Sequence, residues 1–127
     1  MAQKYIEGDI VEYDNKVMVI KEPRDGSHFD LSCPKEELVY CFVSVEDIVP
    51  IPITQEILEK NGWKNDGYDW YRLPTKRAYL YITKDITTLG EFLVCVGLDR
   101  HNLASINFVH QLQHLFFGLG LNSEMEV

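Results

Sequence analysis

The sequence has few cysteines, no long apolar run and no basic cluster, and each absence excludes a class of protein. Only Cys33, Cys41 and Cys95 occur, without CxxC spacing. Secreted disulfide scaffolds have dense, even-numbered cysteines, so we expect reduced thiols here, with Cys41 and Cys95 as small core side chains. No apolar stretch approaches the roughly 18 residues that span a bilayer, and the N-terminus has no signal-peptide core. These absences predict a cytoplasmic protein that does not enter membranes.

Positive charge is also scarce. The chain has 12 Lys and Arg against 20 Asp and Glu, a net charge of −8 over 127 residues, and residues 1–50 alone account for −6. Lys76 and Arg77 are the only adjacent basic pair. An acidic surface repels phosphate backbones and anionic membranes, so the sequence argues against general nucleic-acid binding.

The front of the chain has the pattern of a small β structure. Residues 8–20 predict a hairpin that turns at Asp14 and Asn15, because both residue types tolerate a left-handed backbone. Residues 38–45, LVYCFVSV, are apolar nearly throughout, which indicates a strand buried on both faces. Short strands separated by turns predict an SH3-like subdomain over residues 1–50.

Pro50 and Pro52 mark a boundary, because each removes a backbone donor from a strand. Beyond it, Thr54 and Asn61–Gly62 predict the start and end of a short helix. Period-two patterns predict three antiparallel strands, at 68–73, 77–83 and 91–97. A helical pattern over residues 108–119 closes the chain. The predicted fold class is therefore α+β, with an SH3-like front followed by a helix–three-strand sheet–helix unit over 51–127, the two subdomains sharing a packed interface.

The closing helix is amphipathic. Its apolar side, which includes Leu112 and Phe116, is expected to cover the sheet. Its other side has two imidazoles and two amides and is a candidate binding surface, formed by His110, Gln111, Gln113 and His114. Tyr68 and Trp70, which alternate along the first predicted strand of the sheet, complete this candidate surface with their aromatic rings.

The spacing of His110 and His114 allows both rings to bind one metal ion. However, Gln111 stands where a HExxH motif has its general base. A third ligand would have to come from His101, His28 or a carboxylate such as Asp99. A solvated or sheet-capping face explains both histidines more simply, and a further alternative is that one histidine is buried and hydrogen-bonded to a backbone carbonyl. No catalytic residue and no cofactor are expected, because neither a serine nor a cysteine nucleophile has a suitable context.

Two phrases resemble a group of small uncharacterised proteins found in the genomes, prophages and conjugative elements of gut anaerobic bacteria. The phrases are IPITQEILEKNGW at Ile51–Trp63 and FVHQLQHLFF at residues 108–117, similar to the group's "PIPLT…LxxxGF" and "VHQLQ". The chain departs from the group at His114, where asparagine is frequent, and at Trp63, where phenylalanine is usual. The group has no assigned activity, so the resemblance implies a fold and a genomic setting.

Together these patterns predict a non-catalytic accessory protein of a phage or mobile element that acts through protein–protein contacts. One alternative is a nucleic-acid-associated module, or a DNA mimic whose acids imitate phosphates. Another is a metal-binding protein that uses His110 and His114.

Overall fold

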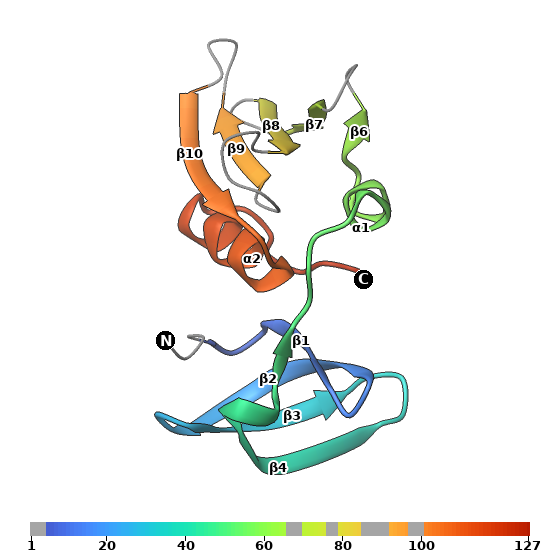
Figure 1. The fold of residues 1–127 in the computed structure, drawn as a ribbon, viewed down its shortest axis with the longest axis vertical. Helices are drawn as coiled ribbons and strands as arrows, with labels where there is room; N and C mark the ends of the chain where they lie inside the picture. The colour runs from blue at the N-terminus through green and yellow to red at the C-terminus, as the bar shows by residue number, and fades with distance from the viewer. Residues whose placement is uncertain (1–4, 66–69, 76–78, 85–91, 97–100) are drawn as a thin grey trace. The chain divides into compact units, whose positions relative to one another are not determined.

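The computed structural model describes residues 5–65, 70–75, 79–84, 92–96 and 101–127, and the chain forms two compact units. Unit 1 consists of Met1–Pro52 and Phe108–Met125, so the chain leaves this unit and later returns to it. Unit 2 consists of Ile53–Asn107 and Glu126–Val127. Within the described residues, each unit contains one five-stranded antiparallel sheet (Figure 1).

The sheet of unit 1 is a meander of four strands whose first strand also pairs with a short fifth strand. Its order, β4-β3-β2-β1-β5, places β4 and β5 at the two edges. A turn of 3-10 helix, Val45–Asp47, leads into the last strand. The strands are β1 (Ile10–Tyr13), β2 (Lys16–Asp25), β3 (His28–Cys33), β4 (Leu38–Ser44) and β5 (Val49–Pro50).

The β1–β2 hairpin turns where the sequence predicts. Asp14 and Asn15 have φ angles of 53° and 60°, and the flanking residues Tyr13 and Lys16 pair across the ladder. Two successive positive φ values define the type I′ turn, whose twist matches that of the strands. The turn residues thus fix the register, which sends Met18 and Ile20 to the buried face.

Alternating apolar residues of β1 to β4 fill the core of unit 1. Tyr5 from the N-terminal segment and Ile48 from the segment before β5 complete it. Each fully buried aliphatic side chain contributes about 1.5–3 kcal/mol. The strand members of this core are Val11, Met18, Ile20, Phe29, Leu31, Cys33 and Val43.

The closing helix α2 (Val109–Gly118) belongs to unit 1. Its apolar side is buried at Val109, Leu112 and Phe116, which confirms the predicted helix and its buried side. The helix ends in a Schellman motif. Leu121 N–H donates to the Phe116 carbonyl at 2.9 Å, and Gly120 has the required positive φ of 73°.

Unit 2 contains a second meander, with strand order β10-β9-β8-β7-β6. Its central three strands correspond to the three that the period-two patterns predict, and β6 and β10 add one outer strand on each side. The strands are β6 (Lys64–Asn65), β7 (Trp70–Pro74), β8 (Tyr79–Lys84), β9 (Phe92–Val96) and β10 (His101–Ile106).

The short helix α1 (Gln55–Lys60) has the predicted signals at both ends. Thr54 Oγ1 accepts from Ile57 N–H at 3.2 Å, which caps the first turn. Gly62 has a φ of 89°, and Trp63 N–H donates to the Leu58 carbonyl at 3.1 Å. This is the predicted Schellman ending, and it buries Trp63.

The predicted α+β fold class is wrong. Both units are built on antiparallel sheets, the chain is mostly β, and the described residues form no helix–sheet–helix unit. The amphipathic pattern of residues 108–119 shows which side of a helix is buried, but it does not show which sheet the helix joins. Both predicted helices form, but α2 belongs to unit 1, and in unit 2 the outer neighbours of the three predicted strands are the strands β6 and β10.

Within the described ranges, no helix has both the length and the apolar character needed to cross a bilayer.

Candidate functional site

The residues of the predicted binding surface lie in different parts of the chain. His110, Gln111, Gln113 and His114 are on α2 in unit 1, whereas Trp70 is on β7 in unit 2. Tyr68 lies outside the described residues. The α2 residues and the aromatic residues therefore have to be considered separately.

His114 forms a pair with a buried aspartate that sequence reasoning missed. Its Nε2 lies 2.9 and 2.8 Å from Oδ1 and Oδ2 of Asp9, and it is the donor because a carboxylate only accepts. Ile6 N–H also donates to Asp9, at 2.9 Å. Burial raises the pKa of Asp9, and the bonds from Ile6 and His114 oppose that rise. The pair connects α2 to the start of β1, 105 positions away.

Both glutamines have structural roles. Gln113 is buried, and its Oε1 accepts from Ile10 N–H at 2.8 Å. Its Nε2 donates to the Gly8 and Ser123 carbonyls at 3.0 and 3.1 Å. Gln111 Oε1 accepts from Phe108 N–H at 3.1 Å and so caps the first turn of α2. Gln113 has no donor left for a partner, because both hydrogens of its amide are used.

His110 is buried beside Tyr5, with ring centroids 5.0 Å apart. Burial, with a smaller contribution from His114, lowers the pKa of His110 from 6.5 to about 4. Burial, with a smaller contribution from Asp9, raises the pKa of the Tyr5 hydroxyl to about 12. Both side chains are therefore neutral at pH 7, and His110 is a core residue of the fold rather than part of an exposed surface.

A cavity of about 280 Å³ lies where α2 meets the start of β1. Asp9 and Gln113, the buried polar residues of its wall, are already bonded to other groups of the protein. The cavity thus offers a ligand few free polar groups. Its lining consists of Ile6, Glu7, Gly8, Asp9, Gln113, His114, Phe117 and Ser123.

The metal hypothesis gains no support from the geometry. His110 and His114 have ring centroids 5.6 Å apart, but His114 Nε2 is bonded to Asp9. In the parts of the chain that the structure describes, no three His, Cys, Asp or Glu residues are placed to hold a metal ion. Asp99, a candidate third ligand in the sequence, lies outside those parts.

The aromatic residues of unit 2 are partly buried and partly exposed. Tyr71 and Tyr81 are buried, and Trp70 packs against Tyr81 in a T-shaped arrangement with centroids 6.3 Å apart. Tyr79 is exposed, and the guanidinium carbon of Arg72 lies 5.0 Å from its ring centroid. Most of the described rings thus belong to the core rather than to an exposed stacking platform.

The largest departure from the sequence prediction is β4. It lies at an edge of the unit 1 sheet (Figure 1), and no described strand pairs with its outer side. The prediction that residues 38–45 are buried on both faces is therefore wrong for most of this segment, as is the core position predicted for Cys41. We use the name β4 edge surface for its exposed side chains, Leu38, Val39, Cys41 and Phe42.

Phe42 combines wide exposure with an unusual backbone. Its side chain is 58% exposed, and its φ is +57°. The β3–β4 pairing shifts register between Leu31↔Tyr40 and Phe29↔Val43. Cys41 and Phe42 together therefore oppose Asp30 in a β-bulge. A bulky residue at positive φ is rare, because the left-handed backbone costs an L-residue about 1–2 kcal/mol.

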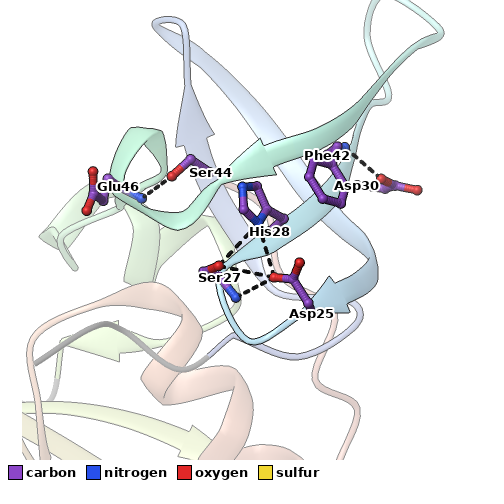
Figure 2. Close-up of polar contacts among 7 residues, drawn as sticks. All are labelled: Asp25, Ser27, His28, Asp30, Phe42, Ser44 and Glu46. Carbon is purple, nitrogen blue, oxygen red and sulfur yellow. Dashed lines mark hydrogen bonds and ion pairs between the residues drawn. The ribbon is translucent and has the colours of Figure 1, made fainter.

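A buried carboxylate holds the bulge in this conformation. Asp30 Oδ1 accepts from Phe42 N–H at 2.9 Å (Figure 2). Its Oδ2 accepts from Arg24 Nε at 2.8 Å. These two bonds, that from Arg24 first, lower the pKa of Asp30. Asp30 is therefore charged at neutral pH, and it fixes the backbone from which Phe42 projects.

The Phe42 ring is also held from one side. It stacks on His28 with centroids 4.2 Å apart and planes 12° apart. His28 Nδ1 lies 3.1 Å from Asp25 Oδ1, which also accepts from Ser27 N–H at 2.8 Å (Figure 2). These bonds, with that from Ser27 the stronger contribution, lower the pKa of Asp25. The aromatic side chain is thus ordered although it is exposed.

Comparison with protein-family models, with curated proteins and with solved structures gave no match, so the function has to be argued from the chain's own geometry.

Proposed function

We propose that this protein is a non-catalytic binding module that takes up a segment of another protein along the β4 edge surface. The observation that supports this most is Phe42, an exposed aromatic ring on a strained backbone that Asp30 and His28 hold in place. Strain of this kind persists only where the surrounding structure determines it, and it gathers at binding and catalytic sites. Glycine, the usual residue at such a position, would remove both the strain and the ring.

The edge supports the same proposal. An antiparallel edge strand directs every second N–H and C=O outward, where an extended peptide can pair with them. Proteins normally protect such an edge with charged side chains, proline or a bulge. Leu38 to Phe42 contains no charge and no proline, and its bulge at Cys41 and Phe42 leaves Leu38 to Tyr40 in regular register with β3. Phe42 N–H is bonded to Asp30, so main-chain pairing would involve Leu38 to Cys41 and the Phe42 ring would contribute a side-chain contact.

The wider role that we propose, an accessory protein of a phage or mobile element, is supported by the resemblance of residues 51–63 and 108–117 to proteins of such elements. A peptide-binding edge is compatible with that role, since it requires no cofactor and no catalytic group.

A pair of matched variants tests the proposed surface. Val39 on β4 and Val49 on β5 are both 49% exposed and lie at opposite edges of one sheet. Peptides are first selected from a randomised display library against the full chain, and their affinities are then measured for Val39→Lys and Val49→Lys. We expect Val39→Lys to lose at least about tenfold in affinity, because a lysine there places a charge in the contact. Equal affinities for the two variants would contradict the proposal.

A further inference from the structure

The charge around the β4 edge surface indicates what kind of segment binds there, an inference that rests on the proposed function. Carboxylates flank both ends of β4: Glu36 and Glu37 precede it, and Glu46 and Asp47 follow it. Lys16 pairs with Glu36 at 2.9 Å. The side chains of the other three form no ion pair within the described residues, and all three are exposed.

The nearby cations do not balance these acids. Arg24 is bound to Asp30, so its charge is already used. Lys35 is the one basic residue in the turn before β4, and the strand itself has none. The surface therefore combines an apolar centre with acidic ends.

This pattern disfavours a second copy of the chain as the partner. In antiparallel pairing of two β4 strands, Glu37 of one copy would face Glu46 and Asp47 of the other. In parallel pairing, each acidic end of one β4 strand would face the same acidic end of the other copy. Both arrangements place like charges opposite each other, in a chain whose net charge is −8.

We infer that the β4 edge surface binds an extended, basic segment of a different protein, with aliphatic residues at its centre and lysine or arginine at both ends. The seven residues of β4 span roughly 23 Å, so the segment needs about nine residues to reach the acids at both ends. His28 covers one face of the Phe42 ring, and the exposed ring also offers a cation–π contact to an arginine or lysine.

Four synthetic peptides of about nine residues test this inference against the full chain. All share one alternating Val/Thr centre. One has Lys and Arg ends, one has Glu ends, one has Ser ends, and the last repeats the basic peptide with alternate backbone nitrogens methylated. Affinities are measured by fluorescence anisotropy at about 50 and about 300 mM salt.

We expect the basic peptide to bind about tenfold more tightly than the Glu peptide at low salt, with a smaller difference at high salt. The triple variant Glu37→Gln, Glu46→Gln and Asp47→Asn should lose this preference. The control Glu56→Gln, Glu59→Gln and Glu124→Gln removes the same charge elsewhere and should keep it.

The outcomes separate this inference from the proposed function. If the Ser or Glu peptide binds as tightly as the basic one, the charge inference is overturned while the proposed function stands. The inference also fails if the control triple loses the preference to the same extent, or if display-selected peptides bind and none of the four synthetic peptides does. Equal binding of the methylated peptide contradicts strand pairing, and with it the proposed function. A concentration-dependent dimer that Val39→Lys abolishes would show that a second copy occupies the surface.

Discussion

Replacing Phe42 by glycine and by alanine tests whether its backbone is strained. In an ordinary strand, glycine is less stable than alanine by about 0.5–1 kcal/mol, because its unfolded chain is more flexible. At a φ of +57°, alanine has an additional strain of about 1–2 kcal/mol that glycine avoids. Both variants lose the His28 stack, which therefore cancels in the comparison. The free energy of unfolding of Phe42→Gly should therefore exceed that of Phe42→Ala by roughly 1 kcal/mol.

The assay is urea unfolding followed by far-ultraviolet circular dichroism, with the free energy of unfolding taken from the midpoint and slope. Val39→Gly and Val39→Ala provide the control, because Val39 is in the same strand and its φ is not positive. There the usual order should hold, with alanine more stable by about 0.5–1 kcal/mol. If Phe42→Gly is less stable than Phe42→Ala by the same margin as the control pair, the backbone at position 42 is not strained and Phe42 does not support the proposed binding surface.

Three further predictions concern unit 1. Gln113→Ala should lower the free energy of unfolding by about 2–4 kcal/mol, because it leaves the backbone groups of Ile10 and Gly8 without their partner. Gln111→Ala removes only a helix cap and should lower the free energy of unfolding by about 0.5–2 kcal/mol. Urea unfolding midpoints compare the two variants. His110 has a folded pKa of about 4, below its ordinary 6.5, so its contribution to stability is complete above pH 6.5 and is lost as pH falls toward 4. Asp9, whose pKa is raised by burial, acts in the opposite sense, because its protonation as pH falls favours the folded state. His110→Leu should flatten the fall in thermal midpoint between pH 6.5 and 4, and an unchanged profile would contradict the role of His110. Asn15→Gly should raise the free energy of unfolding by about 0.5 kcal/mol, since glycine is the favoured second residue of a type I′ turn, and a lower urea midpoint would count against that turn.

Sequence patterns predicted the features that depend on neighbouring residues. The Asp14–Asn15 turn, both ends of α1 and the buried side of α2 follow from local backbone preferences and from periodicity. The central strands of unit 2 follow from period-two alternation in the same way.

The features that the sequence did not reveal depend on tertiary structure. Asp9 and His114 are 105 positions apart, and nothing in either segment indicates that they meet. An apolar run such as residues 38–43 is compatible with a buried central strand and with an exposed edge strand. The acid pairs on each side of the run were an available signal, because charged residues commonly flank hydrophobic strands that are prone to aggregate. No sequence rule places a phenylalanine at positive φ, since glycine is the expected residue there.

Amide hydrogen exchange of the full chain, with and without a display-selected peptide, shows whether the peptide binds along β4. If the β4 edge surface is the binding site, the peptide should slow exchange at Leu38 to Cys41 and leave the β6–β10 sheet unchanged. Protection at the α2–β1 cavity or in unit 2, with no change along β4, would show that the protein binds its partners elsewhere.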